Sequence, residues 1–155
     1  VIGVGRINDP LLAEEALASD KMDMVAMGRA SLADPEMPNK AKEGRLDDIV
    51  HCIACTQGCI GEKVRGNVLC CLVNPSLGHE SEPGYLICPA EIKKKVFVIG
   101  GGISGCEAAI IAARKGHNVT IFEKSDVLGG QWNAASVPLD KTEFCFAGRV
   151  STCIK

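Results

Sequence analysis

Apolar runs and amphipathic segments alternate along the first part of the chain. Residues 1–4 and 22–27 are short apolar runs, and each is followed by an Asp-Pro pair, at residues 9–10 and 34–35. Asp caps free amides at the start of a helix and Pro is tolerated at the first helical position, so each pair is predicted to open a helix. The order of strand, helix, strand and helix predicts parallel strand pairing.

The last third of the chain repeats this order with a stronger pattern. Residues 96–99 form a continuous β-branched and aromatic run, which is typical of a strand buried on both faces. A glycine-rich turn and a helix to Lys115 follow, and residues 119–122 form a second apolar strand. Residues 72–92 contain several Pro and Gly residues and are predicted to be a connection. The sequence therefore predicts an α/β fold.

Composition and charge exclude some classes of partner. The chain has 155 residues, of which 46% are hydrophobic, so it can bury a sizeable core. Its formal net charge is -2 and 4% of its residues are aromatic, which does not suit nucleic-acid binding. We find no signal peptide and no membrane span, so the nine cysteines are predicted to be cytoplasmic thiols. Because the chain begins at Val1 within a predicted strand, we expect it to be an internal piece of a larger protein.

Five cysteines gather in the middle of the chain. Two residues separate Cys52 from Cys55, three separate Cys55 from Cys59, and eleven separate Cys59 from Cys71. Three thiolates from one loop and a fourth from a later segment suit an iron-sulfur cluster or zinc. The spacing alone does not choose between Cys70 and Cys71 as the fourth ligand.

The residues around these thiols favour the redox cluster. Ile53 and Ile60 are predicted to line it and to shield it from water. Zinc usually takes two separated cysteine pairs or mixtures of Cys and His, so it is the weaker alternative. His51 directly precedes the loop and, with four thiols present, is predicted to lie beside the ligands or on the surface.

Glycine and arginine follow each of the first two predicted strands. Gly5-Arg6 and Gly28-Arg29 stand where parallel strands end, and that end of the sheet is where such folds bind ligands. Bare backbone amides and a guanidinium form a plausible phosphate site. The alternative is that the glycines serve turn geometry and the arginines are solvated.

The glycine-rich turn of the second half has the dinucleotide-binding pattern. It follows a strand, opens a helix, and is followed by an acidic residue at the end of the next strand. We expect Gly100 to make the tight turn, Gly102 to let the pyrophosphate approach, and Gly105 to let helix and strand pack closely. Glu123 is predicted to accept the ribose hydroxyls, which favours FAD, ADP or NAD over NADP.

Four stretches resemble one enzyme family: VIGVGRINDP, DMVAMGRASLADPEMPNKAKEGRLDDI, CIACTQGC and CLVNP. These are similar to the iron-sulfur relatives of old yellow enzyme, which include 2,4-dienoyl-CoA reductase, 2-enoate reductase and trimethylamine dehydrogenase. The resemblance covers about residues 1–141. It implies that residues 1–49 end an FMN-binding (β/α)8 TIM barrel and that residues 50–92 are a 4Fe-4S cluster loop and linker. Residues 93–155 would then be the truncated start of a Rossmann-like FAD/NAD(P)-binding domain, with its first βαβ unit.

The resemblance also assigns residues to each cofactor. It implies that FMN phosphate is held by Gly5, Arg6, Gly28, Arg29 and Ala30. It implies that the 4Fe-4S ligands are Cys52, Cys55, Cys59 and Cys71, since the last ligand of the family precedes Leu-Val-Asn-Pro, and Cys70 is then expected to be a packed spare thiol. It implies FAD contacts at Ser104, Glu123, Gly130, Gln131 and Lys141, besides the glycine fingerprint.

The activity that the resemblance implies is an electron relay. NAD(P)H would reduce FAD, the cluster would pass electrons singly, and FMN would deliver hydride to an activated C=C bond of enoate or dienoyl-CoA type. One alternative is amine oxidation like that of trimethylamine dehydrogenase, with electrons leaving to an external carrier and ADP or FAD at the second site. Another is a non-catalytic electron-transfer or zinc-binding fragment.

We assign no catalytic residue, because the family's substrate pocket and proton donors would precede Val1. The isolated 155-residue segment is therefore expected to be inactive. The expected partners are a small-molecule substrate and an electron-transfer protein or a second copy of the chain.

Overall fold

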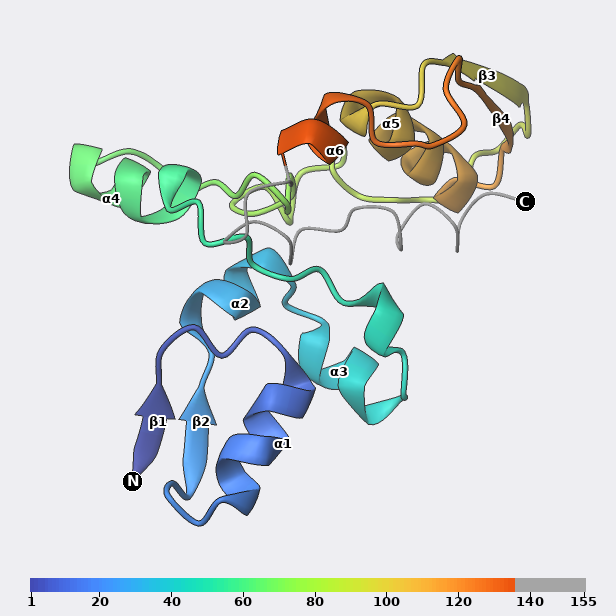
Figure 1. Ribbon diagram of the computed structural model, residues 1–155. Helices are drawn as coiled ribbons and strands as arrows, with labels where there is room; N and C mark the ends of the chain where they lie inside the picture. Colours follow the sequence, from blue (N-terminus) through green and yellow to red (C-terminus); the bar gives the residue numbers. More distant parts are fainter. Residues whose placement is uncertain (136–155) are drawn as a thin grey trace. The chain divides into compact units, whose positions relative to one another are not determined.

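The computed structural model describes residues 1–135, which fold into parts of two compact units (Figure 1). The first unit runs from Val1 to Tyr85, and the second begins at Leu86. Within residues 1–135 each unit contains one pair of parallel strands and at least two helices, which confirms the α/β class and the parallel pairing. The boundary between the units falls inside the predicted connection.

The first unit begins with a strand, a helix and a strand. The strands β1 (Ile2–Val4) and β2 (Met24–Ala26) pair in parallel, and α1 (Pro10–Ala18) connects them. The carboxylate of Asp9 accepts a hydrogen bond from the amide of Leu11 at 2.8 Å. The predicted helix start is therefore confirmed.

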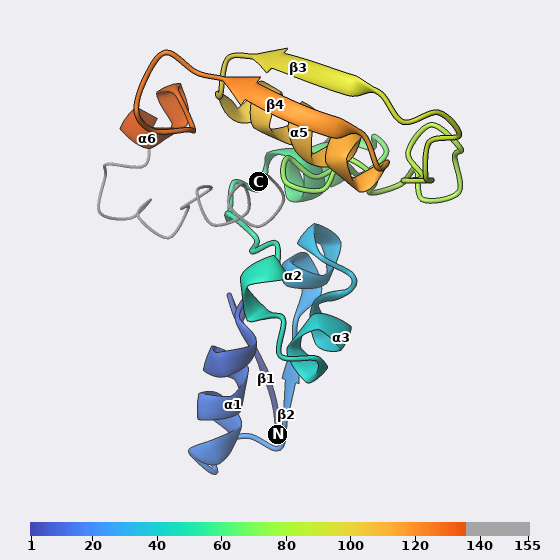
Figure 2. The ribbon, with the colours of Figure 1, turned by 90° about the vertical axis from the view of Figure 1, so that its right-hand side faces the viewer.

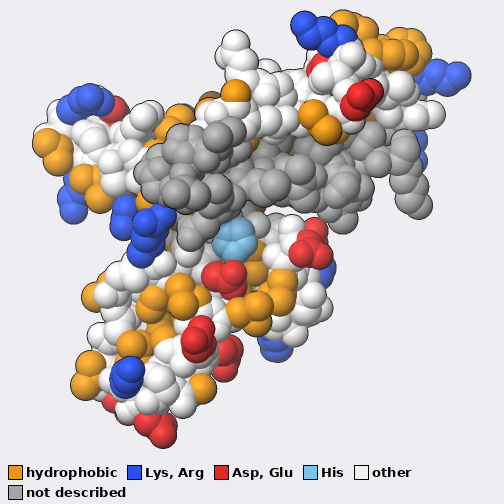
Figure 3. All heavy atoms as spheres, in the orientation of Figure 1, with side chains coloured by type: hydrophobic (Ala, Val, Ile, Leu, Met, Phe, Trp, Pro, Cys, Tyr) orange, Lys and Arg blue, Asp and Glu red, His pale blue; other side chains and the backbone are white. Residues whose placement is uncertain are grey.

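Both strands of the first unit expose apolar side chains. Ile2 is 62% exposed, Val4 77% and Met24 60%. Orange patches over this part of the unit mark such side chains in Figure 3. The core of this unit accordingly lies away from the strands, among the helices that follow β2.

The segment after β2 differs from the predicted single helix. It forms two short helices, α2 (Gly28–Ala33) and α3 (Met37–Lys42), and a 3-10 turn, η1 (Leu46–Asp48). The prediction that Asp34 opens the helix was wrong, because Asp34 ends α2 in an extended conformation. Its carboxylate accepts the amide of Glu36 at 3.1 Å, so the chain makes one turn before α3 begins.

Asp34 is the buried polar centre of this segment. It is 3% exposed and forms an ion pair with Lys40 at 2.6 Å. The same carboxylate oxygen accepts the amide of Val50 at 2.9 Å, which fixes the chain where it leaves the core. The same segment forms a small apolar core: Ala30, Met37 and Ile49, with Met27 and Leu46 packed against them.

The cysteine-rich segment follows with irregular backbone. A π-helical turn, η2 (Gln57–Gly61), leads into α4 (Glu62–Arg65). Ala54 and Thr56 adopt left-handed conformations, with φ of 51° and 58°. Left-handed non-glycine residues and π-turns are uncommon and occur frequently at functional sites, so this loop is held by more than its local sequence.

The second unit contains a βαβ unit. The strands β3 (Lys95–Ile99) and β4 (Asn118–Phe122) pair in parallel, and α5 (Ile103–Arg114) lies along one face of them in both ribbon views (Figures 1 and 2). A short helix, α6 (Gln131–Ala135), comes last among the described residues. Three side chains of α5 are almost completely buried: Cys106, Ala109 and Ile110. Cys106 therefore belongs to the core.

Within residues 1–135, none of the helices combines the length and the apolar character needed to cross a bilayer.

The buried ion pair gives a prediction about local stability. Replacing Asp34 by alanine leaves Lys40, whose side chain is 14% exposed, without its partner. Breaking a buried pair typically costs about 3–5 kcal/mol. We therefore expect amide exchange in α3 to become at least about 100-fold faster, since about 1.4 kcal/mol is a factor of ten. Hydrogen-exchange mass spectrometry on the protein expressed at the full length of its gene measures this.

The matched control is Glu43→Ala, which removes an exposed ion pair between Glu43 and Arg45. Exposed pairs contribute about 0–1 kcal/mol, so exchange in α3 should change by less than about tenfold. Equal effects of the two substitutions would contradict the role given to Asp34.

Candidate functional site

A pocket of about 240 Å³ lies in the first unit at the carboxyl ends of β1 and β2. The structure brings together there all five residues predicted to hold a flavin phosphate: Gly5, Arg6, Gly28, Arg29 and Ala30. They come from the loop after β1 and from the start of α2, more than twenty residues later, and parallel pairing of the strands places these two segments side by side. Their contact with a phosphate stays a prediction.

The chemistry of this pocket suits an anion. Gly5 has a φ of 138° and Arg6 a φ of 48°, so the chain turns sharply as it leaves β1. Arg29 is half-buried and lines the pocket. Its guanidinium makes no hydrogen bond or ion pair with any described residue. A half-buried guanidinium with no anionic partner is well suited to a phosphate group.

The four predicted cluster ligands line a second pocket of the first unit. Cys52, Cys55, Cys59 and Cys71 meet there with their thiols free. Cys70 also lines this pocket and is exposed, so its prediction as a packed thiol was wrong. The apolar lining comes from Ile53, Leu32, Leu72 and Val73. Ile60, which was predicted to contribute, is not part of this lining and is 47% exposed.

Gly58 is a residue of this site that the sequence analysis missed. A Cβ atom at Gly58 would lie 2.4 Å from the carbonyl oxygen of Cys70, so only glycine fits. The amide of Cys70 donates to the carbonyl of Gly58 at 3.0 Å. The loop of the first three cysteines therefore packs directly on the segment that carries the fourth. In the sequence, Gly58 is marked only by its place before Cys59, and a glycine at that place does not by itself indicate close packing.

Four soft thiol ligands around one pocket suit an iron-sulfur cluster or zinc. Burial raises the pKa of the Cys71 thiol, and the nearby Cys52 and Cys55 raise it further, so a metal centre that binds this sulfur would displace its proton. No three Cys, His, Asp or Glu side chains of residues 1–135 are placed to share one metal ion. The pocket is small, about 20 Å³, so the loop would have to open around a cluster.

The two pockets share residues. Arg29 and Cys52 line both of them. Any groups bound in the two pockets would therefore be separated by little more than these side chains.

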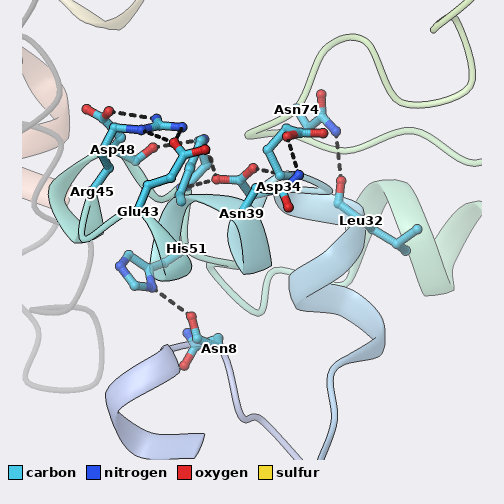
Figure 4. Close-up of polar contacts among 12 residues, drawn as sticks. Asn8, Leu32, Asp34, Asn39, Glu43, Arg45, Asp48, His51 and Asn74 are labelled. Atoms are coloured by element: carbon cyan, nitrogen blue, oxygen red, sulfur yellow. Dashed lines mark hydrogen bonds and ion pairs between the residues drawn. The ribbon is translucent and has the colours of Figure 1, made fainter.

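Three hydrogen bonds tie the cysteine segment to the rest of the first unit. The side-chain amide of Asn8 donates to the carbonyl of Cys52 at 3.3 Å, and Nδ1 of His51 lies 2.7 Å from the carbonyl of Asn8. Further along, the side chain of Asn74 donates to the carbonyl of Leu32 at 2.8 Å. Figure 4 shows the His51–Asn8 and Asn74–Leu32 contacts. Both ends of the cysteine segment are thus anchored.

In the second unit, the glycines of the turn before α5 have the predicted geometry. Gly100 has a φ of 99°, which glycine adopts readily. A Cβ atom at Gly105 would lie 1.9 Å from the carbonyl oxygen of Gly100, whereas one at Gly102 would meet nothing within 4 Å. Gly105 is therefore needed for packing, and Gly102 leaves open space where a ligand can approach the backbone.

Glu123 follows β4 and faces this turn. Its carboxylate accepts the amide of Gly101 at 2.6 Å and both the amide and the hydroxyl of Ser125 at 3.0 Å. These hydrogen bonds lower the pKa of Glu123 to about 2. The carboxylate is therefore ionised at neutral pH. An ionised carboxylate accepts hydrogen bonds from hydroxyl groups and repels a phosphate. Its contact with a ribose stays a prediction.

The remaining predicted FAD contacts lie near this turn or outside the described residues. Ser104 is exposed in the first turn of α5, and Gln131 is exposed at the start of α6. The amide of Gly129 donates to the carbonyl of Gly101 at 2.7 Å, which brings the adjacent Gly130 against the glycine turn. Lys141 lies outside the described residues.

Two family models match the chain. Residues 1–48 match the NADH:flavin oxidoreductase / NADH oxidase family, and residues 95–151 match the FAD dependent oxidoreductase family. Nearly all of the larger pocket's lining lies in the first match, and the glycine turn with Glu123 lies in the second.

Individual proteins match across both regions. The NADH oxidase of Thermoanaerobacter brockii is 49% identical over 92% of this chain and 22% of its own length. The cinnamate reductase of Clostridium sporogenes is 44% identical over 89% of this chain and 20% of its own length. The chain is homologous to the iron-sulfur flavoenzymes of the old yellow enzyme superfamily. This confirms the resemblance, and the chain spans about a fifth of the length of these curated relatives.

Solved structures of such flavoenzymes agree with this assignment. A 2-naphthoyl-CoA reductase in complex with 2-naphthoyl-CoA is 40% identical, with a TM-score of 0.91, over 97% of this chain and 23% of that chain. Histamine dehydrogenase from Rhizobium sp. 4-9 is 30% identical, with a TM-score of 0.85, over 97% of this chain and 22% of that chain. Homologues thus include both reductases and an amine dehydrogenase.

The contrast between the open position of Gly102 and the packed position of Gly105 gives a prediction about flavin binding. Gly102→Val in the protein expressed at full length should lower FAD occupancy without unfolding the second unit, because its side chain fills only the ligand's space. Gly105→Ala should instead destabilise the unit, because its Cβ collides with backbone. Flavin analysis and circular dichroism measure both effects. Equal loss of FAD and FMN in Gly102→Val would contradict the assignment of this turn to FAD.

The lowered pKa of Glu123 gives a prediction about pH. Because the folded pKa is about 2 and the ordinary value is 4.5, the hydrogen bonds of Glu123 add stability above about pH 4.5. That contribution is lost as the pH falls from there through about 2. Carbon NMR of protein labelled at glutamate should show one carboxyl that titrates near pH 2, and Glu123→Gln should remove it. A midpoint for this resonance near 4.5 would refute the predicted hydrogen bonding.

Proposed function

We propose that the chain is the part of an NAD(P)H-dependent oxidoreductase that carries binding residues for FMN, a 4Fe-4S cluster and FAD. The observation that carries this proposal is that a pocket suited to a phosphate and a pocket lined by four cysteines share Arg29 and Cys52. Adjoining sites for a flavin and a cluster are what an electron relay requires. In this reading residues 1–49 end a (β/α)8 barrel, and residues 93–155 begin a Rossmann-like domain.

The residues of the first unit have separate tasks in this relay. Arg6 and Arg29 bind and orient the FMN phosphate, and Gly5 and Gly28 allow it to approach the backbone. Cys52, Cys55, Cys59 and Cys71 hold the cluster, and Ile53 helps to exclude water from it. The cluster, when bound, supplies one-electron transfer between two flavins.

The second unit binds the flavin that receives electrons from NAD(P)H. Gly102 admits the FAD pyrophosphate, and the ionised Glu123 accepts ribose hydroxyls in place of its present partners. For each turnover NAD(P)H gives up two electrons and one proton, and a second proton comes from solvent or a donor in the barrel. The activated C=C bond gains both electrons and both protons and becomes a single bond.

Reduction of a C=C bond is favoured over amine oxidation by sequence similarity. The chain is 44% identical to the cinnamate reductase and 40% identical to the 2-naphthoyl-CoA reductase, against 30% for histamine dehydrogenase. The substrate class we propose is therefore an alkene conjugated to a carboxylate or thioester. Addition of trimethylamine under anaerobic conditions checks the alternative, because an amine oxidiser should bleach its own flavin without NADH.

Substitution of two cysteines, one an assigned ligand and one not, tests the relay. Cys59→Ser replaces a soft thiolate by a hydroxyl that stays protonated near neutral pH, so the cluster should be lost or incomplete. With NADH and cinnamate, turnover of the protein expressed at full length should then fall by orders of magnitude, while NADH still reduces FAD. Rapid-mixing absorbance measurements separate the two steps.

Cys70→Ser is the matched control, because this thiol lines the same pocket but is not an assigned ligand. It should keep the iron content and the turnover. Normal NADH-driven turnover in Cys59→Ser would overturn the relay. Loss of iron in Cys70→Ser but not in Cys71→Ser would overturn the ligand assignment.

A further inference from the structure

Asn8 lines the larger pocket and is hydrogen-bonded to Cys52, which lines both pockets, although neither the motifs nor the resemblance assigns Asn8 a role. It follows Arg6 in the loop between β1 and α1 and lines the larger pocket. Its side-chain amide donates to the carbonyl of Cys52, and its own carbonyl lies 2.7 Å from Nδ1 of His51. Figure 4 shows the second contact. Asn8 thus joins the loop of residues 5–8, called the phosphate loop below, to a segment that begins 43 residues later.

The chemistry of the partners fixes the direction of both hydrogen bonds. A carbonyl oxygen only accepts, so Nδ1 of His51 must carry the proton and donate it to Asn8. The side-chain nitrogen of Asn8 donates in the opposite direction, to Cys52. Two bonds between Asn8 and the dipeptide 51–52 therefore hold the phosphate loop and the first cysteine at a set separation.

Cys52 needs such an anchor because the chain beyond it is strained. Ala54 and Thr56 are left-handed, which costs free energy for residues with a Cβ atom. Such conformations persist where the surrounding contacts determine them. Without the bonds to Asn8, the loop can relax and carry the Cys52 thiol away from the other cysteines.

We propose that Asn8 is a positioning residue that couples occupancy of the larger pocket to retention of the cluster. This inference rests on the function proposed above. A flavin phosphate in the larger pocket orders the loop of residues 5–8, and the bonds of Asn8 and His51 pass that order to Cys52. Binding at either site then stabilises the other by the same factor. The hydrogen bonds of Asn8 go to the backbone of Cys52 and the ring of His51, and it acts through these two partners.

The experiment measures iron release rather than activity. The protein is expressed at full length with its cluster, freed of FMN, and mixed anaerobically with an iron chelator with and without saturating FMN. In the wild type, FMN should slow iron release by about fivefold or more, the lower end of usual coupling between sites. Asn8→Asp keeps the shape but removes the donor, so release should be faster without FMN and should respond to FMN by less than about twofold.

Asn39→Asp is the matched control, because Asn39 is exposed on α3 and donates to Glu36 at 2.9 Å. It makes the same chemical change and should behave as the wild type does. Asn8→Ala, which adds no charge, should behave as Asn8→Asp does. A control variant that loses the response to FMN would overturn the proposal.

His51 gives a second, independent test if the Asn8 variants fail to fold. His51→Ala should lose the response to FMN, and His51→Asn, whose amide can replace the Nδ1 donor, should restore it. Iron release from the Asn8 or His51→Ala variants that responds to FMN as the wild type does would overturn the coupling. A wild-type protein that holds no iron would instead overturn the proposed function, so the two failures are distinguishable.

Discussion

The carboxylate of Asp34 is the interaction on which the first unit depends. It is buried, and it binds the side chain of Lys40 and the amides of Glu36 and Val50. These bonds hold the end of α2, the start of α3 and the segment that leads into the cysteine loop. A buried carboxylate left without partners lowers the free energy of unfolding, so losing one of these bonds is expected to destabilise all three elements. The position of Cys52, two residues after Val50, follows from this arrangement.

The two units place their ligand groups in the same way and differ in charge. In both units, glycines just after the carboxyl ends of parallel strands leave the backbone accessible to a ligand. These are Gly5 and Gly28 in the first unit, and Gly100 and Gly102 in the second. The first unit adds guanidinium groups, which suit a phosphate. The second adds the carboxylate of Glu123, which suits hydroxyl groups. One chain can thus contribute to two nucleotide sites without the two competing for the same chemistry.

Local patterns predicted much of this arrangement. The Asp9 cap, the parallel strands and the packing of Gly105 all follow from contacts between neighbouring segments, which leave regular signals in the sequence. The helix after Asp34 begins at Met37, later than predicted, because residues 34–36 first make a turn on the carboxylate of Asp34. The roles of Gly58 and Asn8 depend on contacts with distant segments. A single glycine or asparagine carries no pattern that would reveal such a contact.

The central claim is that the four cysteines hold a redox cluster beside a flavin pocket. Metal analysis of anaerobically purified protein, expressed at the full length of its gene, tests this claim most directly. The account predicts about four iron and four sulfide ions for each chain, as four thiolates around one cubane cluster require. One zinc ion for each chain, with neither iron nor sulfide, would contradict it.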